Sequence, residues 1–279
     1  MSEDLFLSDA HTHLDQYGPD EIEGIIERAV NTNVLFIVCA GTTLASTRAC
    51  IKLTNEYPIF YAGVGIHPME ATELMDDKSY ELLKSLAEEN EKVVCVSEIG
   101  LDYLADSPDP SIQDQVFRQQ IRLAKSLKLP IIFHSRESHD DVFRILREEH
   151  AGDVGGAMHY FQGDQTTAEN AIDCGFYISL ARPLTRLPEL QEVAKNIPLS
   201  DIVLETDAYP QPFKKNRNSW TEPRHLESIA QQLADLKGLS LQQIAEVTTG
   251  NLARLLNLTH LLESHSCFSY RTSTICNSR

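Results

Sequence analysis

The stretch LFLSDAHTHLD, residues 5–15, ends an apolar run in two histidines one residue apart, with acids on both sides. Residues two apart in a strand point to the same face, so His11 and His13 would project together. At the carboxyl end of a buried strand, two neighbouring imidazoles form half of a transition-metal site. The motif alone also fits surface or core histidines, so the ends of the other strands have to decide between these interpretations.

Short apolar runs alternate with amphipathic stretches along the whole chain. The eight predicted strands are 5–11, 34–40, 59–66, 93–100, 130–135, 156–161, 176–180 and 202–207. Helical patterns lie between them, clearly at 79–91 and 111–129 and weakly after 176–180, and further helices are predicted near 222–236 and 240–256. Eight strand–helix pairs predict a single (β/α)8 TIM barrel. An open doubly wound sheet is the alternative, but its Gly-rich phosphate fingerprint is absent.

The chain has 279 residues without an internal repeat or a low-complexity linker, so we expect one domain over residues 1–258. Residues 259–279 are rich in Ser and Thr and have no helical apolar face beyond Leu262, which predicts a flexible C-terminal tail. We see neither a secretory signal nor a membrane-spanning stretch. The cytosol is therefore the expected compartment, with the nucleus as the alternative.

The net charge of −17 argues against a long non-specific grip on DNA, which comes from neutralised phosphates. It does not exclude a nuclease that holds one strand end, because bound cations reverse the local field. The six cysteines show no close pairing. Cys39 and Cys95 lie in apolar runs and are expected to pack as small hydrophobic residues.

Four more predicted strands end in side chains that bind metals. The carboxyl ends of barrel strands meet at the face where barrel enzymes work, so these side chains should converge. The six candidate ligands are His11, His13, Glu98, His134, His159 and Asp207. A solvated rim would give one or two such residues, whereas six predict a metal centre at this face of the barrel.

Six ligands exceed the three that a catalytic zinc usually takes from protein, which favours two ions that share a carboxylate. Glu98 is the natural bridge; His11, His13 and Asp207 would hold one ion and the two later histidines the other. Two ions suit a phosphoryl displacement, and Asp207 is the best candidate to orient and deprotonate the attacking water. Imidazole ligands favour zinc, with manganese or magnesium as alternatives.

Seven motifs give the chain a family resemblance. They are SDAHTHLD (8–15), GVGIHP (63–68), SEIGLDY (97–103), FHSR (133–136), MHYFQG (158–163), LETDAY (204–209) and GNLARLL (250–256). In this order they resemble the TatD family of metal-dependent deoxyribonucleases, within the amidohydrolase-like barrels. The resemblance implies a TIM barrel, two divalent metals and phosphodiester hydrolysis, often from the 3′ end. The leading hypothesis is therefore a nuclease that acts on DNA, with RNA as the alternative substrate. The family's ligands fall on the same six residues.

The sequence departs from the family pattern on the substrate side. The usual FHCFSG is MHYFQG here, the usual DAPY is DAYP, and residues 211–223 (QPFKKNRNSWTEP) do not match a pattern that we can place. These departures leave substrate preference more open than metal binding.

Other polar residues at the strand ends have a functional and a structural interpretation. His67 could contact phosphate or hydrogen-bond a metal ligand, or it could be a turn histidine. Arg136 could neutralise a phosphate, or it could begin a helix on the surface. Glu205 and Asp9 could support metal ligands or be buried or solvated groups.

Positive charge follows the seventh and eighth predicted strands. Arg182 and Arg186 lie where barrels often bind phosphate, although solvated loop charges are the simpler interpretation. The cluster KKNR at 214–217 could guide a nucleic-acid strand, but most such clusters are solvated. Trp220 could stack a base, or pack a loop against the barrel.

Two other functions remain open at this stage. A small-molecule amidohydrolase or deaminase could use the same barrel, and Glu137 in H-S-R-E resembles the proton shuttle of barrel deaminases. Many dinuclear amidohydrolases bridge their metals with a modified lysine, however, and no lysine ends a predicted strand. A binding protein that has lost catalysis is the third hypothesis, and the complete ligand set argues against it.

Overall fold

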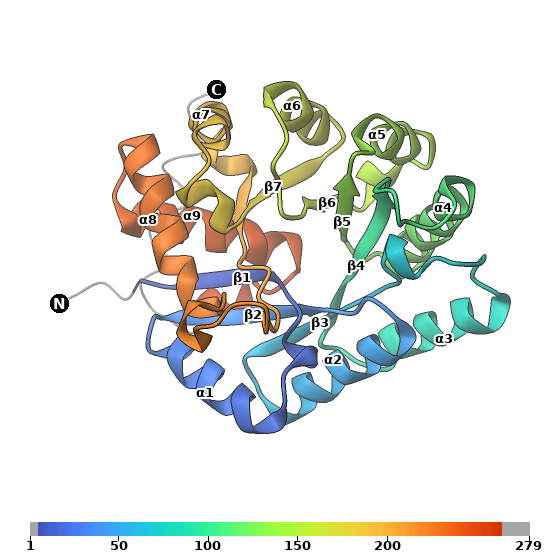
Figure 1. The fold of residues 1–279 in the computed structure, drawn as a ribbon, viewed down its shortest axis with the longest axis horizontal. Coiled ribbons are helices and arrows are strands. Elements are labelled where there is room, and N and C mark those ends of the chain that lie inside the picture. The colour runs from blue at the N-terminus through green and yellow to red at the C-terminus, as the bar shows by residue number, and fades with distance from the viewer. Residues whose placement is uncertain (1–4, 264–279) are drawn as a thin grey trace.

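The computed structural model describes residues 5–263, and its eight strands run parallel in the order β1 to β8 (Figure 1). The strands are β1 (Leu7–Thr12), β2 (Val34–Ala40), β3 (Phe60–Val64), β4 (Val93–Asp102), β5 (Ile131–Arg136), β6 (Gly156–Met158), β7 (Phe176–Leu180) and β8 (Ile202–Leu204). Each strand pairs with the next one along the chain, as expected when a helix returns the chain between parallel strands.

The helices cover the outside of these strands. They are α1 (Pro19–Val30), α2 (Leu44–Glu56), α3 (Asp77–Glu88), α4 (Pro110–Leu127), α5 (His139–Glu148), α6 (Gln165–Asp173), α7 (Pro188–Asn196), α8 (Leu226–Lys237), α9 (Leu241–Leu255) and α10 (His260–Glu263). Local residues fix where several helices begin: Asp76 and Asp164 cap α3 and α6 through their side chains, and Pro110 opens α4. None of the helices in residues 5–263 is long and apolar enough to cross a membrane.

The barrel is closed between β1 and β8 by contacts that lie beyond the last residue of β8. The Asp207 N–H donates to the carbonyl oxygen of His11 at 3.0 Å. The Asp9 carboxylate accepts the backbone N–H of Thr206 at 2.8 Å and the Thr206 hydroxyl at 2.5 Å. This seam places the first histidine motif beside the last predicted strand, although nearly two hundred residues separate them.

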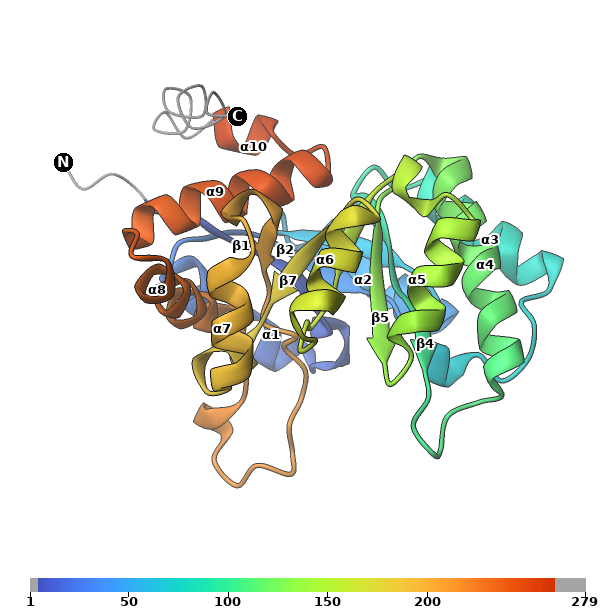
Figure 2. The same ribbon diagram turned by 90° about the horizontal axis from the view of Figure 1, so that it is seen from above.

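Helix α9 covers the amino-terminal end of the strands. Its Asn251 amide donates to the carbonyl oxygens of Leu199 and Ile202, and the Thr249 hydroxyl donates to Phe6. Figure 2 shows α9 at one end of the barrel and the loop between β8 and α8 projecting past the opposite end, where the β5 arrow ends. The closed end leaves the carboxyl ends of the strands as the open face.

The TIM-barrel prediction is confirmed, and the helix after β7 exists as α7 although its sequence pattern was weak. The predicted start of the tail at residue 259 differs from the structure, because residues 260–263 form α10. Leu258 and Leu262 lie four residues apart and are both buried in the same apolar cluster as Leu252 of α9. The rest of the predicted tail, residues 264–279, lies outside the described residues.

Candidate metal centre

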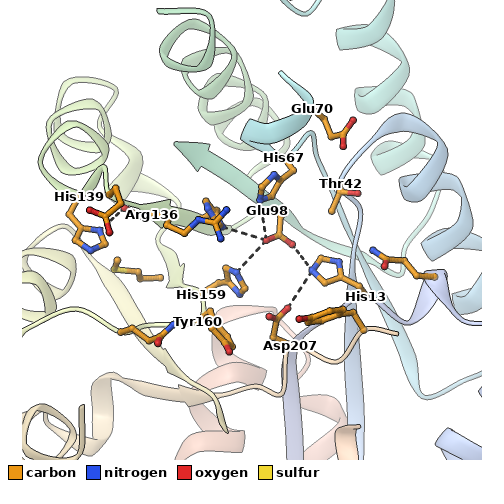
Figure 3. Close-up of a pocket in the computed structure, with 17 residues that line it drawn as sticks. His13, Thr42, His67, Glu70, Glu98, Arg136, His139, His159, Tyr160 and Asp207 are labelled. Atoms are coloured by element: carbon orange, nitrogen blue, oxygen red, sulfur yellow. Dashed lines mark hydrogen bonds and ion pairs between the residues drawn. The ribbon is translucent and has the colours of Figure 1, made fainter. Parts of the chain in front are cut away.

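A cavity of about 730 Å³ opens at the carboxyl ends of the strands (Figure 3). Its lining includes His13 after β1, His67 after β3, Glu98 of β4, His134 of β5 and Asp207 after β8. The side chains that the sequence placed on separate predicted strand ends therefore meet at one opening of the barrel.

Glu98 lies at the centre of this group, and its two carboxylate oxygens face different histidines. Oε2 is 2.7 Å from His11 Nε2 and 2.9 Å from His13 Nε2. Oε1 is 3.3 Å from His159 Nε2 and 3.8 Å from His134 Nδ1. One buried carboxylate thus separates two sets of imidazole nitrogens, which is the arrangement required of a bridging ligand.

The backbone of Glu98 is left-handed, with φ +60°, in the middle of a strand that is paired on both sides. The pairing of β4 with β5 shifts its register between Ser97 and Ile99, on either side of Glu98. A non-glycine residue in this region costs about 1–2 kcal/mol. Asp207 has the same conformation, with φ +50°, so both carboxylates of the centre are aimed by a strained backbone.

His134 is oriented by a carboxylate behind it. Its Nε2 lies 3.0 Å from Asp102 Oδ2, and a carboxylate can only accept, so this nitrogen carries the hydrogen. The opposite nitrogen, Nδ1, then presents its lone pair towards Glu98. Asp102 also accepts the backbone N–H of Leu104 at 3.1 Å and the hydroxyl of Ser107 at 3.0 Å, which fixes the carboxylate itself.

His159 is oriented in the same way by Glu205. The His159 Nδ1 donates to Glu205 Oε1 at 3.1 Å, which leaves Nε2 free to face Glu98. The fully buried Glu205 also accepts the backbone N–H of Tyr160 at 2.7 Å and the hydroxyl of Ser179. Carboxylates that hold the far nitrogen of a histidine are typical of metal sites, because they fix the ring and its tautomer.

The electrostatics of the centre are those of tightly coupled opposite charges. Burial alone would raise the pKa of the Glu98 carboxyl, but the fields of His11, His13 and His159 hold it well below its usual value. Burial alone would lower the pKa of His13, but Glu98 and Asp207 raise it well above its usual value. The carboxylates that face His159 raise its pKa in the same manner. Protons and a cation therefore compete for the same atoms.

His67 differs from the other histidines of the centre. Its Nδ1 accepts the backbone N–H of Met69 at 3.0 Å, and its Nε2 lies 3.9 Å from Glu98 Oε1. Burial lowers the pKa of His67 to about 3, so the ring is neutral and its hydrogen is on Nε2. That nitrogen is a hydrogen-bond donor that faces the centre.

Arg136 lines the cavity, but its charge is shared with Asp102. The guanidinium donates to Asp102 Oδ2 through Nε at 2.9 Å and approaches it through Nη2 at 2.7 Å. About half of the side chain remains exposed. The structure therefore places Arg136 where a substrate can reach it, as a partly neutralised cation.

The residues fit a divalent cation by their spacing and their chemistry. Two ligands about 2.1 Å from one ion, at a tetrahedral angle, lie about 3.4 Å apart. His11 Nε2 and His13 Nε2 are 3.3 Å apart, and His13 Nε2 is 3.4 Å from Asp207 Oδ1. Within residues 5–263, three overlapping groups at this centre have ligand atoms within 4.8 Å of one another; they are His11–Glu98–His159, His11–His13–Asp207 and His67–Glu98–His134.

The structure brings together all six predicted ligands, and it adds a residue that the sequence did not single out. Asp102 lies two residues after the predicted strand 93–100, where an acid is ordinarily solvated, yet in the structure it ends β4, is buried and holds His134. Glu205, weighed as a supporting group, holds His159. Asp9 clamps the barrel seam and accepts the backbone N–H of His11 at 3.4 Å.

Two further residues are placed by the structure outside this network. Trp220 packs near Tyr17, with ring centroids 6.1 Å apart, which supports the loop-packing interpretation. Glu137 is exposed on the cavity rim, has φ +55° and is absent from the three groups of ligand atoms. The structure therefore gives no support for a proton shuttle at Glu137.

A parallel eight-stranded barrel with histidines and carboxylates converging at its carboxyl end defines the class of metal-dependent barrel hydrolases. The comparisons narrow this class. The family model for TatD related DNase matches residues 8–257. The chain belongs to the TatD family of metal-dependent hydrolases.

Relatives and solved structures agree with this assignment over nearly the whole chain. Uncharacterized metal-dependent hydrolase YabD of Bacillus subtilis (strain 168) is 39% identical, covering 91% of this chain and 99% of its own. Deoxyribonuclease TATDN3 of Homo sapiens is 30% identical, covering 92% and 97%. The crystal structure of YJJV, a TatD homolog from Escherichia coli K12, superposes with a TM-score of 0.81 at 29% identity, covering 90% and 98%.

Proposed function

We propose that the protein is a deoxyribonuclease that hydrolyses phosphodiester bonds from the 3′ end of DNA with two divalent ions. The observation that carries the proposal is the position of the Glu98 carboxylate, whose two oxygens face separate sets of histidines. A single-ion centre needs no such bridge. The deoxyribonuclease name of the human relative supports the substrate class.

In this proposal the six converging residues hold the ions, with His11, His13 and Asp207 on one side of Glu98 and the two later histidines on the other. Two ions in these positions, zinc or alternatively manganese or magnesium, would polarise the phosphoryl oxygens and lower the pKa of a water. Asp102 and Glu205 accept the hydrogen of the far nitrogen of their histidines, so the nitrogen that faces Glu98 is the one available to an ion once a competing proton leaves.

The proton and the substrate are handled by this chain's own groups. The interaction with His13 holds the pKa of Asp207 below its usual value against the effect of burial, so it is ionised near neutral pH and can accept a proton from the attacking water. The Nε2–H of His67 can donate to a phosphate oxygen, and Arg136 can approach the same phosphate from the rim.

The small-molecule amidohydrolase is the second candidate. Its dinuclear members commonly place a lysine at the bridging position, and here Glu98 occupies that position. No lysine is among the described residues that line the cavity. The deaminase would need Glu137 as a proton shuttle beside the metal, but Glu137 is exposed on the rim and belongs to none of the groups of ligand atoms.

The test is the purified full chain on single-stranded DNA labelled at either end, loaded with zinc, manganese or magnesium, with and without chelator. We expect a ladder from the 5′-labelled strand and a labelled mononucleotide from the 3′-labelled strand, both abolished by chelator. Binding of a single ion per chain, or no cleavage with any of the three metals, would contradict the proposal. An RNA strand in parallel reactions measures the sugar preference.

A further inference from the structure

The rim of the cavity is divided by charge. On the side of β3 and β5 the lining carries Glu70 and Glu137, and the charge of Arg136 is shared with Asp102. On the side of β7 and β8 lie Arg182, in the short helical turn Arg182–Thr185, and the loop between β8 and α8. An anionic strand that leaves the cavity is repelled by the first side and attracted by the second.

A chain of hydrogen bonds fixes two of the cations on the second side. Arg182 Nη1 donates to Thr221 Oγ1 at 3.1 Å, and the Thr221 N–H donates to Gln211 Oε1 at 3.1 Å. The same oxygen of Gln211 accepts Lys214 Nζ at 2.6 Å. Gln211 lies two residues after Tyr209, which lines the cavity, so this network begins at the cavity rim.

A third cation, Arg186, directly follows the helical turn Arg182–Thr185. Burial lowers the pKa of Lys214, and the positive charges of Arg182 and Arg186 lower it further. Burial raises the pKa of Tyr160, which lines the cavity, to about 12, and the positive charge of Arg186 opposes this rise. Within residues 5–263, neither Arg186 nor Lys214 forms an ion pair with a carboxylate. In a chain of net charge −17, this is a notable gathering of uncompensated positive charge.

The last residue of the KKNR cluster, in contrast, is committed to the protein. Arg217 donates to Glu21 and Glu222 at 2.9 Å each, and its guanidinium lies 4.4 Å from the ring centroid of Trp220. The cluster that the sequence suggested as a guide for nucleic acid is therefore split. Arg217 fixes the loop, and Lys214 joins the arginines that follow β7.

An exposed aromatic residue adjoins these cations. Phe213, directly before Lys214, is 70% exposed, the most exposed large apolar side chain in residues 5–263. Its loop projects past the open end of the barrel (Figure 2). Single-stranded nucleic acids bind surfaces that combine basic groups for the backbone with aromatic rings on which bases stack.

We propose that Arg182, Arg186, Lys214 and Phe213 form a binding surface for the single strand that extends from the cavity. The three cations neutralise phosphates, and the ring of Phe213 stacks on a base. The proposal rests on the proposed nuclease function, because it assigns the path of a strand whose end lies at the metal centre. The chemistry recognised is a polyanionic strand with exposed bases, in preference to a nucleotide monomer.

The first experiment measures binding to the metal-loaded protein by fluorescence anisotropy, with a single-stranded phosphorothioate oligothymidylate of about twelve nucleotides as the probe. We expect Phe213→Ala to weaken binding by about 5- to 150-fold, the range for loss of one stacked base. Lys214→Gln should weaken binding and reduce the slope of log K against log salt by about 0.7, the value for one phosphate of a single strand. Lys52→Gln, on the outer helix α2, is the matched control and should change neither.

The second experiment measures hydrolysis of bis(p-nitrophenyl) phosphate, which is too small to reach the surface, with the same variants. Unchanged turnover of this diester together with weakened strand binding supports the proposal. Equal loss of both would place these residues in the cavity chemistry and overturn it, as would unchanged strand binding in both variants. Competition by polyglutamate as effective as by an oligonucleotide would show a general anion surface and also overturn it. Weakened strand binding in a protein without diesterase activity would uphold this surface while refuting the proposed function.

Discussion

The hydrogen bond between His134 and Asp102 leads to a prediction for metal affinity whose size follows from the geometry. In Asp102→Asn the side chain keeps its shape but has one oxygen and one NH2 group. Asp102 now accepts from His134 and Arg136 on one oxygen and from Leu104 and Ser107 on the other. Either orientation of the amide turns a donor towards a donor and leaves at least one buried hydrogen bond unmade, which costs about 1–3 kcal/mol.

The His134 imidazole can relieve this conflict by changing its tautomer, but the change removes a ligand atom from the metal centre. If the hydrogen of His134 moves from Nε2 to Nδ1, the nitrogen that faces Glu98 no longer presents a lone pair. We therefore expect Asp102→Asn to weaken binding of the ion that His134 would hold by about 10- to 100-fold, the usual effect of removing a partner behind a ligand histidine. This range equals about 1.4–2.7 kcal/mol.

The assay is a competition titration of the metal-free protein with a chromophoric chelator, which resolves the affinities of successive equivalents. The matched control is Asp141→Asn. Asp141 also carries a charge near β5 and pairs with Tyr103 and Arg144, but it does not contact His134. The reasoning is refuted if His134→Ala weakens one equivalent while Asp102→Asn leaves both affinities at the wild-type value.

Three further predictions follow from the centre and from the close approach of β4 to β5. Glu98→Gln should lose at least about 100-fold in hydrolysis while its circular dichroism is unchanged, and an active purified variant would exclude the bridging role. Burial lowers the pKa values of His13 and His159, but the carboxylates that face them outweigh this effect, so both histidines bind protons near neutral pH. Because these protons compete with the metal, metal affinity should rise from pH 6 to pH 8. A flat profile would contradict this competition. Gly100→Ala would place a methyl group 1.9 Å from the carbonyl oxygen of His134, so it should cost well over 2 kcal/mol in urea unfolding. Gly238→Ala also has a positive φ but meets open space, and it should cost only about 1 kcal/mol; equal losses would contradict the steric argument.

The barrel and the convergence of ligands could be predicted because both depend on local information. An apolar run followed by an amphipathic stretch predicts a strand and a helix, and parallel strands bring their carboxyl ends to one face. His11, Glu98 and Asp207 were therefore assigned to one site without any knowledge of distances. The residue types at the strand ends carried this signal.

The parts that could not be predicted depend on pairing between distant segments. Asp102 pairs with Arg136 across β4 and β5, and only this register places its carboxylate behind His134. Arg217 belongs to a basic cluster in the sequence, but its partner Glu21 lies 196 residues away. Charge patterns along the chain do not show which cations are already compensated.

The left-handed backbone of Glu98 was equally invisible, since the sequence VVCVSEIGLD reads as a regular strand. The histidines of the centre have no positive φ, whereas both carboxylates do. Side chains alternate between the two faces of a regular strand. The register shift between Ser97 and Ile99 interrupts this alternation at Glu98 and lets its carboxylate turn into the opening. In this centre, the strained backbone conformations thus belong to Glu98 and Asp207, whose side chains a regular strand would not point into the opening.

This account predicts a reversal of the usual order of two substitutions. In an ordinary strand, Gly is less stable than Ala by about 0.5–1 kcal/mol. At position 98 both Glu98→Gly and Glu98→Ala remove the same carboxylate, but only Ala keeps the left-handed strain, which costs about 1–2 kcal/mol. We therefore expect Glu98→Gly to be the more stable of the two in urea unfolding with chelator present. At Ser97, whose φ is not positive, the usual order should hold. If Ala is the more stable at both positions, the backbone at Glu98 is not strained, and its direction must come from the packing of the histidines around it.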